Sequence, residues 1–486
     1  MNKSILLLVL VIVSIIGSID SKKVFNVRTD LKNQLKFRHF DDSLDYDAIN
    51  YQWFTQSVDH FNPANPTTFQ QRYLINDQYW DGTGPVFIMI NGEGPMDINT
   101  VTQLQFVVWA KQVSALVVSL EHRYYGASFV TEDLSLENLQ WLNSAQALAD
   151  NAVFRNFVAQ QYNVPKESKW ISFGGSYSGA LTSWFRIKYP HLVDATIASS
   201  APVNPEVNFY QYLETVQTAL LASKSNGNLC VENINIATQK IQALLSQDNY
   251  GGVDQMFNLC TPLGNQNDVA TFMQSLAGNF MGVVQYNDEE PGQIDIDYLC
   301  NIMTNQSSDP LTNYIQIWDQ YADGECVDVS YASMIAQNQN VTNDENAIGG
   351  RMWFYQTCVE FGYYQSSDAP SANQPFGNLF PFQPYQIQQC ADSFGIPNMY
   401  PNVNWTITEY GGINPEPSSV DNTLYVNGSN DEWHNLAILP GNANAKNTLY
   451  IIGTSHCADM MIPTSVSPPT LAQAQQIIFE FIQANI

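Results

Sequence analysis

The sequence predicts an α/β fold, in which a mostly parallel sheet with flanking helices is interrupted by a helical insertion. From about residue 85 to residue 203, short apolar runs alternate with segments of helical periodicity, the pattern of parallel strands joined by helices. From about residue 205 to residue 402 the periodicity is helical, and strand-like runs return only after it. One α/β domain split by a helical cap is the simplest arrangement of these elements.

The elements expected in the first part alternate in type. In order, they are a strand at 85–90, a helix at 100–113, a strand at 114–120, a helix at 136–162, a strand at 169–173, a helix at 179–189 and a strand at 194–198. In the insertion, helical periodicity is clearest at 207–221 and 234–245. The last part supplies strands at 423–426 and 448–452 and a closing helix at 471–484.

A serine stands at the apex of the turn between the strand at 169–173 and the helix that follows it. Gly174 and Gly175 precede Ser176, and Ser178 and Gly179 follow within three residues. This order of strand, small residues, serine and helix is that of a nucleophile elbow in an α/β-hydrolase. An ordinary glycine-rich turn explains the segment equally well when it is taken alone.

A nucleophilic serine needs a histidine base, and the base needs an acid that orients it. The chain has six histidines, and in the order serine, acid, histidine the candidates are His434 and His456. His456 and Asp431 lie in loops that follow separate strand-like runs, so we prefer this pair. Glu432 is the competing acid and His434 the competing base.

The same fold predicts an oxyanion hole made from backbone amides. One donor should be the N–H of Tyr177, which follows the nucleophile. The other should come from the loop after the apolar run at 84–90, where Gly92 and Glu93 are both candidates. A plain glycine-proline turn is the alternative interpretation of that loop.

Four separated motifs resemble the prolyl carboxypeptidase family of serine peptidases. They are Glu121-His-Arg-Tyr-Tyr-Gly126, the segment Gly174-Gly-Ser-Tyr-Ser-Gly-Ala-Leu181, Met352-Trp-Phe-Tyr-Gln-Thr-Cys-Val-Glu-Phe-Gly362, and the tail from Asn427 through Asp431 and Trp433 to His456. The likeness extends from about Tyr51 to the C-terminus, and it is closest to the thymus-specific branch of the family.

The resemblance implies a serine exopeptidase that works through an acyl-enzyme, with Ser176 as nucleophile, Asp431 as orienting acid and His456 as general base. It implies no metal or cofactor, and peptides as substrates. It also assigns Trp433 to the substrate pocket, with Trp353, Tyr355 and Gln356 as further cleft residues; a core helix is the alternative role for the segment with the last three.

The expected preference is for proline or small residues before the scissile bond. Proline-specific relatives tend to have methionine where this chain has Ala180, which predicts a wider pocket. Dipeptidyl peptidase and carboxypeptidase activity both stay open. An esterase or lipase on the same scaffold and a catalytically silent binding protein are the alternative functions.

The first residues predict a secreted or lysosomal protein. A basic start, a twelve-residue apolar run at 5–16 and small residues after it are typical of a signal peptide, here residues 1–18. Residues 19–45 are interpreted as a propeptide or a flexible N-terminus. The α/β domain then comprises 46–204 and 403–486, and the cap comprises 205–402. No later apolar run is long enough for a membrane span.

Cysteine usage agrees with an oxidising compartment. Six of the seven cysteines lie between positions 230 and 390, which indicates three disulfides in one region. The family resemblance implies the pairs Cys358–Cys390, Cys230–Cys300 and Cys260–Cys326. Cys457 is left over beside His456, and no elbow surrounds it.

The charge of the chain and its glycosylation motifs also bear on its partners and its modification. The formal net charge is −27, which disfavours nucleic acid and anionic membrane surfaces as partners. Glycan acceptors are expected in a secreted protein at the Asn-x-Ser/Thr sites Asn305, Asn340, Asn404 and Asn427, although Asn427 lies close to Asp431. The sequence does not choose between a monomer and a homodimer.

Overall fold

The computed structural model describes residues 23–24, 44–247, 249–287 and 291–486. The expected signal peptide and nearly all of the segment 19–45 lie outside the described residues. The described part contains an eight-stranded sheet in the order β12-β11-β7-β6-β4-β5-β3-β2. Its strands are β2 (Gln52–Ser57), β3 (Thr68–Asn76), β4 (Val86–Ile90), β5 (Leu116–Leu120), β6 (Trp170–Gly175), β7 (Ala195–Ser199), β11 (Thr423–Gly428) and β12 (Asn447–Ile451).

Six of these strands run parallel, from β12 across to β5, while β3 and β2 continue the sheet antiparallel. The central strands are apolar and buried along their whole length, because helices cover both faces of a parallel sheet. This arrangement sends the carboxyl ends of β6, β7, β11 and β12 to one edge, where open α/β sheets carry their functional groups.

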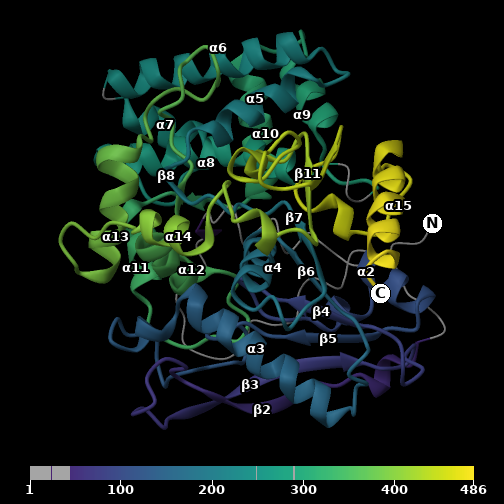
Figure 1. Cartoon of the computed structure of the whole chain (residues 1–486). Helices are drawn as coiled ribbons and strands as arrows, with labels where there is room; N and C mark the ends of the chain where they lie inside the picture. Colours follow the sequence, from purple (N-terminus) through teal and green to yellow (C-terminus); the bar gives the residue numbers. More distant parts are fainter. Residues whose placement is uncertain (1–22, 25–43, 248, 288–290) are drawn as a thin grey trace.

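Four helices cover the two faces of the sheet (Figure 1). Their bounds are α2 (Gln105–Gln112), α3 (Ser144–Gln161), α4 (Tyr177–Lys188) and α15 (Pro469–Gln483). The apolar side chains of α3 and α4 share one core with one face of the strands. Those of α2 and α15 share a second core with the opposite face. The sheet is therefore sandwiched between two helical layers, the architecture of an α/β-hydrolase.

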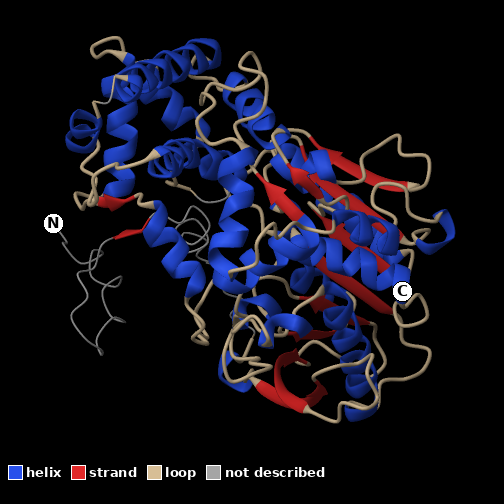
Figure 2. Ribbon diagram, turned by 90° about the vertical axis from the view of Figure 1, so that its left-hand side faces the viewer, coloured by secondary structure: helices blue, strands red, loops and turns tan. Residues whose placement is uncertain are grey.

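The insertion between β7 and β11 forms the predicted helical cap, which lies beside the sheet domain (Figure 2). Its helices are α5 (Gln211–Leu221), α6 (Gly227–Ser246), α7 (Tyr250–Met256), α8 (Gln266–Gln285), α9 (Ile296–Met303), α10 (Pro310–Ala322), α11 (Tyr331–Gln339), α12 (Gly350–Gln356) and α13 (Ile387–Phe394). Helix α14 (Val403–Tyr410) leads back to the sheet. Two short parallel pairs accompany them: β8 (Glu206–Asn208) with β10 (Gly362–Tyr364), and β1 (Lys23–Val24) with β9 (Val327–Asp328).

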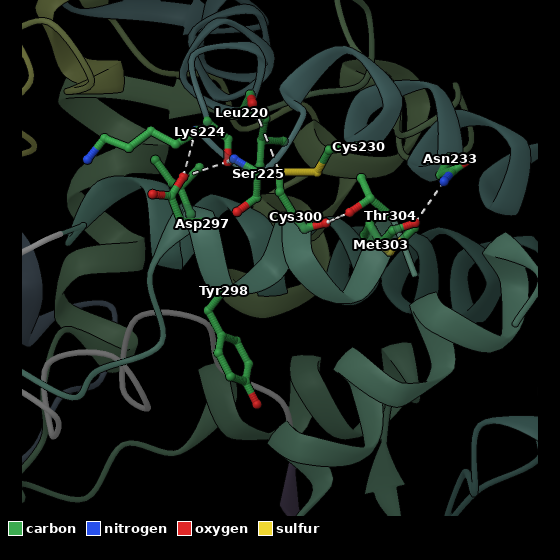
Figure 3. Close-up of a disulfide and its surroundings, with 12 residues drawn as sticks. Leu220, Lys224, Ser225, Cys230, Asn233, Asp297, Tyr298, Cys300, Met303 and Thr304 are labelled. Atoms are coloured by element: carbon green, nitrogen blue, oxygen red, sulfur yellow. Dashed lines mark hydrogen bonds between the residues drawn. A yellow bond between two sulfur atoms is a disulfide. The ribbon is translucent and has the colours of Figure 1, made fainter. Parts of the chain in front are cut away.

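Three disulfides link cap elements, and they join the same cysteines that the family resemblance pairs: Cys230–Cys300, Cys260–Cys326 and Cys358–Cys390. The first joins α6 to α9 (Figure 3). Hydrogen bonds reinforce that joint, since Lys224 N donates to Asp297 Oδ1 at 2.9 Å and Asn233 Nδ2 donates to the Met303 carbonyl at 2.7 Å. Covalent links of this kind stabilise the cap by restricting the unfolded chain.

Several elements differ from the expectation. Strands β2 and β3 were not predicted, because β3 contains Gln70, Gln71 and Arg72 where a buried strand normally has apolar residues. Gln71 is nevertheless fully buried, since its amide donates to the Glu121 carbonyl at 2.8 Å and it accepts from Gln56 at 3.1 Å. The segment 207–221 begins as strand β8 and becomes helical only at Gln211.

In the described part of the chain, no helix combines the length and the apolar character needed to cross a membrane.

Candidate active site

The turn at Ser176 has the geometry of a nucleophile elbow. Strand β6 ends at Gly175, and α4 begins at Tyr177. Ser176 between them has φ 61° and ψ −131°, a backbone conformation that residues other than glycine rarely adopt. A Cβ at Gly174 would lie 2.2 Å from the Ser178 carbonyl oxygen, and one at Gly179 would lie 2.5 Å from the Ser199 carbonyl oxygen. Strand and helix approach so closely here that only glycine fits.

Ser178 replaces the glycine of the usual pattern, and the structure gives its hydroxyl a role. Ser178 Oγ donates to the carbonyl oxygen of Ile90, at the end of β4, and accepts from Gly175 N at 3.3 Å. The start of α4 is thereby fixed to the strand from which the expected oxyanion loop leaves.

Asp431 and His456 meet at the same edge of the sheet. Asp431 follows β11 and His456 follows β12, and His456 Nδ1 lies 2.7 Å from Asp431 Oδ1. Both side chains are buried. Asp431 also accepts from Trp433 N at 3.0 Å. A carboxylate on Nδ1 fixes the histidine ring so that Nε2 is the nitrogen available for proton transfer.

Ser176 is half-buried, and its hydroxyl makes no hydrogen bond within the described residues. The elbow nevertheless adjoins the histidine loop, because a Cβ at Gly175 would lie 2.8 Å from Cys457 Sγ. Hydrogen bonds between catalytic groups often close only when substrate binds.

Three neighbours hold the loop that carries His456. His456 N donates to the Gln285 carbonyl at 3.0 Å, Cys457 N donates to Ser200 Oγ at 2.8 Å, and Ser199 Oγ donates to Asp459 Oδ2. Gln285 is on cap helix α8, whereas Ser199 and Ser200 are at the end of β7. The cap and the sheet both position the candidate base.

The electrostatics agree with the preferred acid and base. Burial works against the charge on Asp431, yet His456, Ser200 and His434 together outweigh it and lower the pKa of the carboxyl. Burial likewise works against an imidazolium at His456, yet the contacts with Cys457 and Asp431 raise the pKa of the ring well above its ordinary value. Burial raises the pKa of Glu432 well above its ordinary value, so its charged form is disfavoured and this competing acid is the poorer partner for a histidine.

His434, the competing base, is bonded to the backbone of Asp431. Its Nδ1 lies 2.5 Å from the Asp431 carbonyl oxygen, and its ring packs edge-on against Tyr450. The Asp431 carboxylate instead contacts His456. The geometry thus favours His456 over His434.

The loop after β4 lies against the elbow, as the oxyanion hole requires. A Cβ at Gly92 would lie 3.2 Å from Ser178 N, so this backbone packs on the first turn of α4. The amides at the start of a helix point outward and attract negative charge. The carbonyl of Glu93 accepts from Gly349 N at 3.1 Å, which links the loop to the cap just before α12.

The side chain of Tyr177 joins three of the four motifs. Its hydroxyl lies 3.2 Å from His122 Nε2 and accepts from Gln356 Nε2 at 2.9 Å. Tyr125 in turn donates to Gln356 Oε1 at 2.6 Å. Because the ring of Tyr177 is packed against Trp353, with centroids 5.1 Å apart, its backbone amide beside the nucleophile has little freedom to move.

The four expected substrate residues have different surroundings. Trp433 packs on His456 with ring centroids 6.1 Å apart, and Trp353 lines a cap cavity. Gln356 is fully buried in the Tyr177 network, and Tyr355 packs edge-on against Phe394. The structure therefore brings the two tryptophans to the site and gives Gln356 and Tyr355 contacts inside the protein.

Sequence reasoning did not identify Ser199, Ser200, Gln285 and Asp459, which surround the triad candidates. The two serines directly follow the strand predicted at 194–198, and Asp459 follows His456 closely, so there was a weak indication in the sequence that they lie near the site. Nothing in the sequence indicated Gln285, because it is far from the other site residues along the chain although it contacts His456 in the fold. No cluster of His, Cys, Asp or Glu in the described residues is arranged to hold a metal ion.

This fold and this elbow define a serine hydrolase of the α/β-hydrolase class. Residues 56–478 match the family described as serine carboxypeptidase S28. The chain belongs to that family, and it is therefore a serine-type peptidase, as the four motifs indicated.

Relatives cover nearly the whole chain. It is 34% identical over 448 residues to the thymus-specific serine protease of Homo sapiens, covering 89% of this chain and 85% of the relative. It is 27% identical over 462 residues to the lysosomal Pro-X carboxypeptidase of Homo sapiens, covering 88% and 87%. Among solved structures, VinJ is 10% identical with a TM-score of 0.37, covering 89% of this chain and 99% of that one.

Proposed function

We propose that this protein is a serine exopeptidase in which Ser176 is the nucleophile, His456 the general base and Asp431 the residue that orients the base. The buried contact between Asp431 and His456 at the strand ends beside the elbow is the observation that carries the proposal. Ser176 attacks the scissile carbonyl while His456 Nε2 takes its proton. His456 then gives the proton to the leaving amine, and water hydrolyses the acyl-enzyme by the same route.

The Tyr177 amide and an amide from Gly92 or Glu93 bind the oxyanion in this proposal. Their support is the packing of Gly92 on the first turn of α4 and the closed hydrogen-bond network around the Tyr177 ring. Fixed donors of this type stabilise the transition state without reorganising during the reaction.

The net charge of the chain, rather than the cavity wall, favours an amino end over a carboxyl end of the substrate. In the described part of the chain, no lysine, arginine, aspartate or glutamate lines the cap cavity, so its walls do not distinguish a carboxylate from an ammonium group. Arg351 is nearest to it in sequence, but its guanidinium donates to the carbonyls of Leu134 and Asn338 and lies over Phe394. The net charge of −27 also attracts an ammonium group and repels a carboxylate.

We therefore propose trimming from the amino end, as in a dipeptidyl peptidase, with proline or a small residue before the scissile bond. Ala180, in place of the methionine of proline-specific relatives, favours tolerance of several residues at that position. We also propose a secreted or lysosomal location, in line with the relative whose name is lysosomal. Asn305, Asn340 and Asn404 are exposed and suit glycans, whereas Asn427 is buried and bonded to Ile438.

Two matched peptides test the proposal. One has a free amino end and the sequence Lys-Pro or Lys-Ala before an amide reporter; the other is blocked at the amino end and finishes in Pro-Phe with a free carboxylate. The proposal predicts cleavage of the first, little cleavage of the second, and none of either by Ser176→Ala. Preferential cleavage of the blocked peptide would overturn the amino-end assignment, and an active Ser176→Ala protein would overturn the nucleophile.

A further inference from the structure

The end of strand β7 contacts the segments of all three candidate triad residues. The Ser199 carbonyl accepts from Ser176 N at 3.0 Å and so holds the backbone of the proposed nucleophile. The next residue, Ser200, accepts from Cys457 N at 2.8 Å through its Oγ, which holds the loop of the proposed base. Ser200 N donates to the Val426 carbonyl at 2.7 Å, on the strand that leads to the proposed acid.

Ser200 has a strained backbone and a buried side chain. Its φ is 47°, in the left-handed region that residues other than glycine rarely adopt, and the residue is only 1% exposed. Backbone strain of this kind persists where the surrounding structure fixes it, and it is frequent at active sites. The hydrogen bonds of Ser200 to β11 and to the loop after β12 provide that fixation, so its Oγ has little freedom to move.

One oxygen of the proposed acid has no partner. Asp431 is fully buried, and its Oδ1 lies 2.7 Å from His456 Nδ1 and accepts from Trp433 N at 3.0 Å. Its Oδ2 makes no hydrogen bond within the described residues. A buried carboxylate oxygen that lacks both water and a donor is unfavourable.

The Ser200 hydroxyl is placed to supply the missing donor. It is close enough to Asp431 to contribute to the lowered pKa of that carboxyl. The Cys457 amide occupies one lone pair of Ser200 Oγ, and a serine hydroxyl that accepts one hydrogen bond still has its proton to donate.

We infer that Ser200 is a positioning residue for the proposed acid, and that its hydroxyl donates to Asp431 Oδ2 while it accepts from Cys457 N. The inference rests on the proposed peptidase function. With Oδ2 held by Ser200, the carboxylate is kept from rotating and Oδ1 stays directed at His456. The donated hydrogen bond also withdraws part of the negative charge from the carboxylate, which limits how far Asp431 favours the imidazolium.

Other titratable groups surround Asp431 and His456 in the part of the chain that the structure describes. They are Cys457 and Asp459 after β12, Glu432 and His434 after β11, Tyr450 on β12, and Tyr212 and Tyr286 of the cap. Ser200→Ala retains all of them. A disturbed Cys457 would lower the pKa of His456, because its present contact raises that pKa; loss of the Ser200 hydroxyl acts in the opposite direction.

Ser200→Ala, made in the full chain with its disulfides intact, tests the inference. We expect kcat to fall about tenfold or more with little change in KM, because a hydrogen bond to a charged group is lost and the buried hydroxyl does not reach the substrate. The acid limb of kcat/KM should move to higher pH, since a carboxylate without this donor raises the pKa of His456 further. An unchanged kcat, or an acid limb that stays in place or moves to lower pH, would overturn the inference.

Two further variants separate this role from a loss of stability. Ser200→Gly also lacks the hydroxyl, but glycine suits a φ of 47°, so it should fold at least as well as the alanine variant and show the same shift of the acid limb. Ser172→Ala is the matched control, because Ser172 is buried on β6 and shares a 2.8 Å hydrogen bond with Thr196 Oγ1. Its acid limb should stay in place, and a shift as large as that of Ser200→Ala would contradict the inference.

A fluorophosphonate probe keeps the two proposals apart. If the unmodified protein is labelled at Ser176 and both Ser200 variants keep its kinetics, the protein is a peptidase in which Ser200 does not position the acid. If the unmodified protein is not labelled at Ser176, the proposed function itself is contradicted.

Discussion

At the scale of single residues, Cys457 is the unexpected neighbour of the triad. It is the one free cysteine in the described part of the chain, its backbone has φ 58°, and it follows the candidate base directly. Burial raises the pKa of its thiol. Its contact with His456 contributes to the raised pKa of the ring, so this thiol influences when the base is neutral.

Replacing the thiol should therefore move the pH profile. A base must be neutral to accept a proton, so kcat/KM falls as the pH drops through the pKa of His456. Cys457→Ala removes one contribution that raises this pKa, and the acid limb should shift to lower pH with little change on the plateau. The measurement is kcat/KM from pH 4 to pH 9 for both proteins. An acid limb that stays in place would show that Cys457 does not affect the base.

Most of the candidate triad could be predicted from the sequence, because the chain has few histidines and each candidate follows a strand. The choice between Gly92 and Glu93 could not, since two adjacent amides differ only in direction, which depends on the folded loop. Gln285 could not be found either. Its contact with His456 depends on how the end of α8 in the cap meets the loop after β12, and a single sequence contains no record of that packing.

At the scale of elements, residues of the family motifs connect segments that are far apart in the sequence. The motif at Glu121 places His122 and Tyr125, the elbow places Tyr177, and α12 places Gln356 in one hydrogen-bonded cluster. A second connection links the segment after α12 to the start of α3, because the Glu360 carboxyl accepts from Ser144 Oγ at 2.8 Å and from Ser144 N. A carboxylate is stabilised at this end of a helix.

The parallel strands and their helices were predictable because apolar runs of strand length alternate with helical periodicity. The antiparallel pair β2–β3 was not, since its inward-facing polar residues are stabilised by distant partners such as Glu121. Within the segment 352–362, the chain passes from α12 through a π-helical turn (Thr357–Phe361) into β10, where one helix was the alternative expectation. The division at residues 204 and 402 stays a proposal.

At the scale of the whole molecule, buried carboxyl groups make folding more favourable at acidic pH. Burial raises the pKa of Glu360 and of Asp459 to about 7 each, and it also raises the pKa of Glu432 well above its ordinary value. A carboxyl group with a raised pKa contributes its full stabilisation of the folded state below the unfolded pKa near 4. That contribution is lost as the pH rises through the pKa of the folded state. The pKa values of Asp150 and Asp431 are lowered. These two groups stabilise the folded state above the unfolded pKa near 4, and their contribution is lost as the pH falls through the folded value.

The melting temperature should therefore be higher at pH 5 than at pH 8. Repulsion within a chain of net charge −27 acts in the same direction. Thermal unfolding with the disulfides intact, at pH 5, 6.5 and 8, is the measurement. Glu360→Gln retains an acceptor for Ser144 but does not titrate, so its melting temperature should vary less with pH. A melting temperature that is equal or higher at pH 8 in the unmodified protein would contradict the assignment of these buried groups.

Ser176 is proposed as a nucleophile that His456 and Asp431 activate. The most direct test is to treat the folded protein with a fluorophosphonate and locate the adduct by mass spectrometry of its peptides. We expect a single adduct on Ser176, and labelling slower by about 10²-fold or more in His456→Gln, which lacks the base. An adduct on another residue, or labelling of Ser176 at the same rate without His456, would contradict it.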